Sequence, residues 1–169
     1  SLLYVNEYLV EFVVRDFIVY PMLASIVFLF FNFRKKAKCF LGDIGSRGIA
    51  FWVIALLAIL MIKTEQINWV LFLAVYGADT ILTILERIKL KENIFDAHRR
   101  HLYQLFANDK KKSHLLVSSV YSVLQLFINF IVIKNNWSDW LNFSLILLPT
   151  LVLYLIIKIK VKKQILFAN

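Results

Sequence analysis

The stretch LLVSSVYSVLQLFINFIVI, residues 115–133, decides the fold, because it has no charged side chain and is long enough to cross about 30 Å of hydrocarbon as a helix. Similar apolar segments occupy residues 17–33, 48–62, 69–85 and 140–157. Inside a bilayer the backbone polar groups must be satisfied within each segment, so each is predicted to be helical. The sequence predicts an all-α, polytopic membrane bundle with about five transmembrane helices.

Composition supports a membrane as the solvent. Of the 169 residues 60% are hydrophobic and only 18% charged, and the mean hydropathy is +0.71, which excludes an ordinary soluble domain. Residues 2–14 are less apolar, since Asn6, Glu7 and Glu11 interrupt them, and predict an interfacial or re-entrant helix. Without repeats or linkers, residues 1–169 are interpreted as a single transmembrane domain. The absence of an initiator Met suggests a fragment.

Basic residues are divided unevenly between the loops. One lies in each of the second and fourth loops, Lys63 and Lys134, whereas the first loop, the third loop and the C-terminal tail are rich in Lys and Arg. The positive-inside rule therefore predicts that these three regions are cytoplasmic and that the N-terminal end is external. The formal charge of +9 follows from these loops and does not indicate a nucleic-acid partner.

The first loop reads NFRKKAKCFLGDIGSRG, residues 32–48, and places three glycines around Asp43 and Ser46. Glycines allow the backbone to approach a ligand closely, and the N-terminus of a following helix favours anions. Asp43 is then a candidate oxygen ligand for Mg²⁺, which prefers one or two carboxylates plus substrate phosphates. The alternative is that Asp43 and Ser46 cap a helix that starts near Gly48, with the lysines serving only as topology determinants.

The third loop contains ENIFDAHRRHLYQ, residues 92–104. His98 and His101 share a face if this segment is helical, but no cysteine or third ligand accompanies them, so a zinc pair has little support. Phosphate recognition by Arg99, Arg100 and His101 is favoured, because guanidinium groups match phosphate oxygens. A solvated basic loop is the alternative.

Asp79 interrupts the apolar segment 69–85. An ionisable side chain at that depth is costly unless it faces a protein interior or a wet cavity, so Asp79 is a functional candidate. Structural pairing with an Arg or Lys is the competing hypothesis.

Two motifs in order resemble one family. The segment FLGDIGS, residues 40–46, is similar to the AKxFMGDxGS signature of the polyprenyl-phosphate N-acetylhexosamine-1-phosphate transferases. Asp79-Thr80, followed by DAHRRHLYQ at residues 96–104, is similar to the later half of that family. The resemblance covers residues 28–125, and the HLYQ form looks like the branch that initiates O-antigen or capsule repeats on undecaprenyl phosphate.

The resemblance implies a cytoplasmic active site in the bacterial inner membrane that uses Mg²⁺, with Mn²⁺ as an alternative. It implies that Asp43 coordinates the metal, that Phe40 lies near the uracil, and that His101 contacts the diphosphate. A UDP-N-acetylsugar, undecaprenyl phosphate and membrane lipid are the implied partners, and a homodimer is compatible with it. The further residues expected at the substrate are Asn32, Gly42, Ser46, Asp79, Arg99 and Arg100.

Members of the family also carry an adjacent Asp-Asp pair and an Asn-x-x-Asn-x-x-Asp-Gly motif earlier in the chain. Neither occurs in these residues, which resemble the C-terminal part of the transferase domain, so this stretch alone is expected to be inactive. Two other classes stay open. A transporter would use Asp79 on an ion pathway, and a non-catalytic scaffold would bind anionic lipid through its lysines. The glycine-bracketed Asp43 favours the transferase.

Overall fold

A computed structural model describes residues 1–94, 96, 99–135 and 137–166, and every regular element in this part of the chain is helical. Five stretches within it are long and apolar enough to cross a membrane. The predicted all-α membrane bundle is therefore confirmed. These stretches are α2 (Arg15–Asn32), α3 (Gly42–Thr64), the 3-10 helix η1 (Ile67–Leu73) continued by α4 (Ala74–Lys89), α6 (His114–Lys134), and α7 (Asp139–Asn142) continued by the π-helix η3 (Phe143–Leu147) and α8 (Leu148–Leu166).

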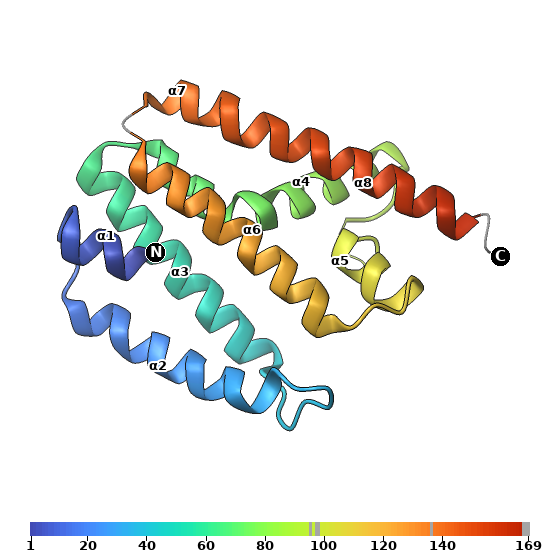
Figure 1. Cartoon of the computed structure of the whole chain (residues 1–169), viewed down its shortest axis with the longest axis horizontal. Coiled ribbons are helices and arrows are strands. Elements are labelled where there is room, and N and C mark those ends of the chain that lie inside the picture. Colours follow the sequence, from blue (N-terminus) through green and yellow to red (C-terminus); the bar gives the residue numbers. More distant parts are fainter. Residues whose placement is uncertain (95, 97–98, 136, 167–169) are drawn as a thin grey trace.

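The N-terminal helix α1 (Leu2–Tyr8) is too short to cross a bilayer. Its Asn6 side chain is buried and accepts hydrogen bonds from the backbone amides of Phe12, at 2.9 Å, and Val13, at 3.1 Å. These bonds satisfy amides in the turn that leads from α1 into α2. Helix α1 contacts α2 and lies at the end of the molecule opposite the first loop (Figure 1).

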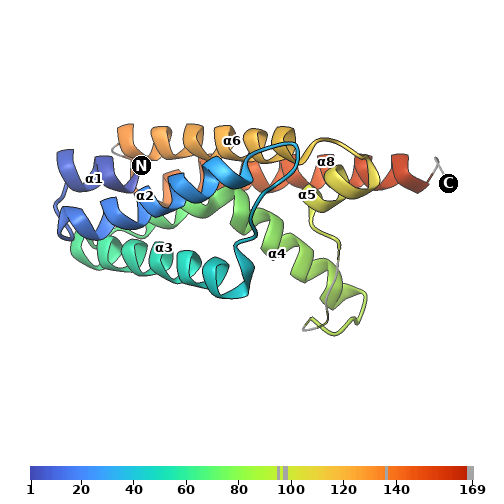
Figure 2. The ribbon, with the colours of Figure 1, turned by 90° about the horizontal axis from the view of Figure 1, so that it is seen from below.

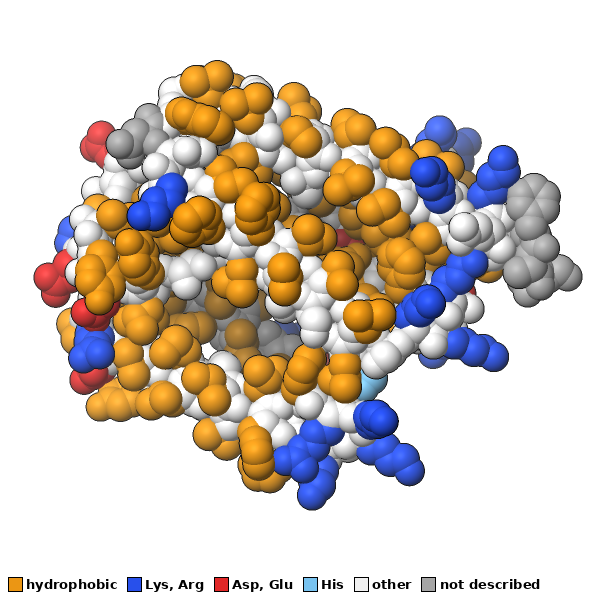
Figure 3. Space-filling view, in the orientation of Figure 1, with side chains coloured by type: hydrophobic (Ala, Val, Ile, Leu, Met, Phe, Trp, Pro, Cys, Tyr) orange, Lys and Arg blue, Asp and Glu red, His pale blue; other side chains and the backbone are white. Residues whose placement is uncertain are grey.

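The main core forms around η1. Leu71 and Phe72 of η1 are buried with Leu56 and Leu60 of α3, and η1 also contacts α6. On the outside, large apolar side chains such as Phe51 are exposed in great number, and they cover the visible face in Figure 3. An apolar surface of this extent suits contact with lipid tails.

The two ends of the bundle differ in charge. The first loop, the short helix α5 (Leu102–Gln104) and the C-terminal end of α8 lie at one end, and α1 and α7 lie at the other (Figure 1). Figure 3 shows the Lys and Arg side chains gathered mainly at the first end, with the visible Asp and Glu side chains mainly at the other. The basic loops thus share one end, as the sequence predicts.

Two predicted boundaries are wrong. Helix α3 begins at Gly42 rather than near Gly48, which places Asp43 and Ser46 inside its first turns. Helix α8 continues to Leu166, so Lys158 and Lys162, assigned from sequence to a tail, lie on a helix beside α4. Figure 2 shows α4 slanting away from α6 and α8 toward its C-terminal end. The side chains of Lys158 and Lys162 reach from α8 to Thr83 and Glu86 of α4.

Candidate functional site

Asp79 is the centre of a buried polar cluster. The residue is 2% exposed, and its Oδ1 lies 3.1 Å from Nδ1 of His101 and accepts from the backbone amide of Leu102 at 3.2 Å. The Tyr121 hydroxyl of α6 donates to Oδ2 at 3.4 Å. One carboxylate therefore links α4 and α6 to the third loop.

Tyr154 of α8 completes this cluster. Its hydroxyl donates to Oδ1 of Asp79 and accepts from the amide of Leu102 at 3.3 Å. A buried carboxylate is tolerated in apolar surroundings when several donors surround it, and these donors come from three separate parts of the chain. The expectation that Asp79 faces a protein interior agrees with this arrangement. The competing hypothesis, pairing with an Arg or Lys, is not what the described contacts of Asp79 show.

Polar residues continue from Asp79 along the contact between α4 and α8, at spacings of three or four that place them on one helical face. Nζ of Lys158 lies 2.8 Å from Oγ1 of Thr83 and 3.0 Å from Oε2 of Glu86, and Lys162 pairs with the other Glu86 oxygen. We call this contact the α4–α8 seam; its members are Asp79, Thr83 and Glu86 on α4 and Tyr154, Lys158 and Lys162 on α8.

Ion pairs tie the third loop to the seam. Arg100 lies 3.6 Å from Oε1 of Glu86 and also pairs with Glu92. Arg87, which is buried, donates to the backbone oxygen of Ile94 at 3.1 Å and to that of Asn93. The loop is thus held at several points, and Arg100 has acidic partners within the protein.

The glycine loop, by which we mean residues 40–48 including the first turns of α3, is built differently. Asp43 has an 88% exposed side chain, and its carboxylate lies 3.7 Å from Arg47 one turn later in α3. Oγ of Ser46 donates to the backbone oxygen of Asp43 at 3.1 Å, and neither side chain caps the helix. Gly42 has φ of +68°, which L side chains rarely adopt, at the start of α3. Phe40 is 92% exposed.

The residues fit Mg²⁺ only through a single carboxylate. Among the described residues no three His, Cys, Asp or Glu side chains gather into a metal site. Mg²⁺ does not require such a cage, since it takes one or two carboxylates and completes its shell with phosphates and water. Asp43 is accessible enough to be such a ligand.

A groove of about 500 Å³ lies between the C-terminal end of α2, the third loop and α6. Asn32 and Phe33, at the end of α2, line it together with Tyr103 of α5 and with His114 and Tyr121 of α6. Tyr103 stacks on His101, with ring centroids 5.6 Å apart, so the groove reaches the Asp79 cluster. Burial raises the pKa of the Tyr103 phenol, and the negative charge of Asp79 raises it further.

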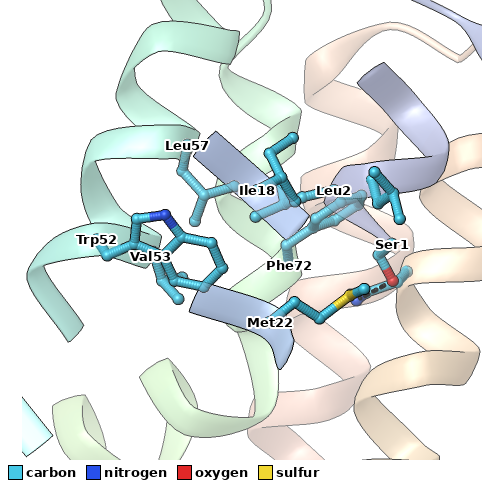
Figure 4. Close-up of a pocket in the computed structure, with 10 residues that line it drawn as sticks. Ser1, Leu2, Ile18, Met22, Trp52, Val53, Leu57 and Phe72 are labelled. Carbon is cyan, nitrogen blue, oxygen red and sulfur yellow. Dashed lines mark hydrogen bonds between the residues drawn. The ribbon is translucent and has the colours of Figure 1, made fainter. Parts of the chain in front are cut away.

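A second cavity, of about 250 Å³, lies between α1, α2, α3, η1 and α6, away from the charged seam. Figure 4 shows Trp52, Leu57, Ile18, Met22 and Phe72 around it. Two of the lining residues are joined by a hydrogen bond, in which Nδ2 of Asn129 donates to Oγ of Ser1 at 2.9 Å. The lining is mostly apolar and lacks the charged groups that phosphate binding needs.

The structure thus divides the predicted site residues into two groups. Asp79, Arg100 and His101 belong to the seam and the loop docked on it, whereas Phe40, Gly42, Asp43 and Ser46 lie in the exposed glycine loop. Asn32 lines the groove at the C-terminal end of α2, and Arg99 is exposed. His98, the expected companion of His101, lies outside the described residues.

Sequence reasoning missed Glu86, Tyr121, Tyr154, Lys158 and Lys162. A signal was present. Tyr154, Lys158 and Lys162 recur every four residues, as do Asp79 and Thr83, so both helices carry a polar stripe. Only the packing shows that these two stripes face each other.

Comparisons with protein-family models, curated proteins and solved structures found no match to this chain.

Proposed function

We propose that these residues are part of a membrane enzyme that transfers a sugar-1-phosphate from a UDP-N-acetylsugar to undecaprenyl phosphate. The reaction releases UMP and initiates a cell-surface polysaccharide at the cytoplasmic face of the bacterial inner membrane. Two routes fit this reaction: an oxygen of the lipid phosphate attacks the β-phosphorus of the UDP-sugar directly, or an aspartate of the enzyme attacks it first and then passes the sugar phosphate to the lipid phosphate. The bond from that phosphorus to the bridging oxygen breaks, and UMP leaves with this oxygen.

One observation carries the proposal: Asp79 holds the third-loop segment that begins at His101 at the basic end of the bundle. Arg99 is exposed next to this segment, so its guanidinium is free to meet a diphosphate at the surface. His101, stacked on Tyr103 at the groove, is the second candidate contact. Arg100 takes a different part, since Glu86 and Glu92 neutralise it and it anchors the loop.

The glycine loop supplies the remaining groups. Asp43 would hold Mg²⁺, which when bound neutralises the diphosphate and the charge that develops on the departing UMP. Gly42 and Ser46 offer backbone and hydroxyl groups to phosphate at the start of α3, where the helix dipole favours an anion. Phe40 is exposed enough to stack on the uracil, and Asn32 lines the groove toward Tyr103.

A transporter with Asp79 on an ion pathway is less well supported. Asp79 is buried, and tyrosine hydroxyls and a backbone amide occupy both oxygens of its carboxylate. An ion would have to displace these donors. A scaffold that binds anionic lipid through its lysines gives no reason for this cluster.

The test is Mg²⁺-dependent release of UMP from a panel of UDP-N-acetylsugars with undecaprenyl phosphate, using the protein at the full length its gene encodes. We expect Asp43→Asn to lower the rate by roughly 100-fold or more, because a charge-stabilising group at the diphosphate is lost. Asp16→Asn is the matched control, since Asp16 is also exposed in the first turn of a helix. No release from folded wild-type protein with any sugar would overturn the proposal.

A further inference from the structure

Lys158 is an unusual lysine for a membrane helix. It is 4% exposed, although it lies well inside α8. A buried ammonium group is costly and persists where partners compensate for the lost hydration. Oε2 of Glu86 at 3.0 Å and Oγ1 of Thr83 at 2.8 Å are those partners. Lys160, two residues later, is exposed and shows what an ordinary lysine of this helix does.

The partners of Lys158 connect it to the third loop. The Glu86 carboxylate that it orients also attracts Arg100, at 3.6 Å. One turn before Lys158, the Tyr154 hydroxyl accepts from the amide of Leu102 and donates to Asp79. Helix α8 therefore fixes the loop on both sides of His101.

Apolar contacts also hold the segment after His101 against α8. Leu102 and Leu105 are buried in a small cluster with Tyr154 and Val161 of α8. The segment that starts at His101 is thus docked on α8 by a hydrophobic contact as well as by the polar seam. Docking costs backbone conformational entropy, so the docked fraction depends on how many of these contacts are present.

We infer that Lys158, together with Tyr154, is a positioning residue that keeps the third loop docked so that His101 and Arg99 meet the diphosphate of the sugar donor. This inference rests on the proposed transferase function. If the loop undocks for part of the time, the apparent affinity for the donor falls in proportion to the docked fraction. A bound donor redocks the loop, so the maximal rate is retained.

The kinetic test compares Lys158→Met with Lys160→Met in the full-length protein. We expect Lys158→Met to raise KM for the UDP-sugar roughly 10-fold, which corresponds to a docked fraction of about one tenth, with kcat within about two-fold and KM for undecaprenyl phosphate unchanged. Lys158→Arg should restore KM, and Lys160→Met should leave it unchanged. A general loss of folded protein would instead lower apparent kcat without changing KM. An unchanged donor KM in Lys158→Met, or the same rise in Lys160→Met, would overturn the inference.

Tyr154→Phe provides a second variant that keeps the ring and removes the hydroxyl. We expect it to raise the donor KM in the same selective way, with Tyr20→Phe, an exposed tyrosine of α2, as its control. A donor KM equal to that of the control would show that the hydroxyl does not position the loop.

Hydrogen–deuterium exchange in lipid nanodiscs gives a readout that needs no activity. Amides of residues 99–106 should exchange faster in Lys158→Met than in wild type, while those of α3 exchange equally. If the wild type releases no UMP, the proposed function fails but this comparison still decides whether Lys158 docks the loop. If UMP is released and exchange of residues 99–106 is unchanged, the positioning inference fails and the function stands.

Discussion

The α4–α8 seam and the glycine loop each contain an acidic residue that the sequence singles out, yet they surround it in opposite ways. Asp79 is buried and takes donors from the third loop, α6 and α8, whereas Asp43 is exposed and lies near Arg47 alone among its described charged neighbours. A carboxylate with its donors already in place holds a structure together. An accessible one at a helix start has oxygens to offer to a ligand. Under the proposed function, the seam shapes the site and the glycine loop binds the metal and the donor.

The largest expected effect is on the unfolding free energy, which should respond very differently to the loss of each of the two carboxylates. Asp79→Ala leaves the Tyr154 and Tyr121 hydroxyls and the Leu102 amide without their acceptor, so we expect it to lower the unfolding free energy by about 3 kcal/mol. Asp43→Ala should change it by less than about 0.5 kcal/mol, as is usual for exposed sites. Reversible unfolding in mixed micelles measures both. Equal losses in the two variants would end the distinction between a shaping and a binding region.

A smaller effect concerns the backbone of the glycine loop. Gly42 has φ of +68°, so Gly42→Ala should cost about 1 kcal/mol through backbone strain, although no atom lies within 4 Å of the added Cβ. Gly48 also has open space but lies within α3 with no such φ, so Gly48→Ala should be neutral or stabilise by about 0.5 kcal/mol. The same unfolding measurement applies. If Gly42→Ala is as well tolerated as Gly48→Ala, the loop does not depend on this glycine for its conformation.

The smallest effect probes Tyr103, which lines the groove beside the Asp79 cluster. Burial, and then the charge of Asp79, raises the pKa of its phenol above the ordinary value of 10.0. The folded state therefore favours the protonated phenol, and the stability that this adds is present below pH 10 and lost as the pH rises through the raised pKa. Asp79→Asn should lower the Tyr103 pKa, as followed by NMR of ¹³C-labelled tyrosine. A pKa that is the same in both proteins would mean that Asp79 does not act on the groove.

The sequence was sufficient for the class of fold. Apolar runs such as residues 115–133 can satisfy their backbone in a bilayer only as helices, and the loop charges predict which ends lie together. Asp79 could also be singled out, because a lone carboxylate in an apolar segment needs an explanation wherever it points. These inferences depend only on local composition and require no knowledge of how the helices pack.

Tertiary structure alone decided which polar residues meet. Lys158 follows an apolar run and reads as the start of a basic tail, but α8 continues past it and packs on α4, so its ammonium group meets Glu86 instead of water. His101 and Asp79 are 22 residues apart, and the loop between them has to fold back before they touch. Composition and periodicity determined the helices of this protein. The pairing of their polar faces depended on contacts between distant segments, which no local pattern specifies.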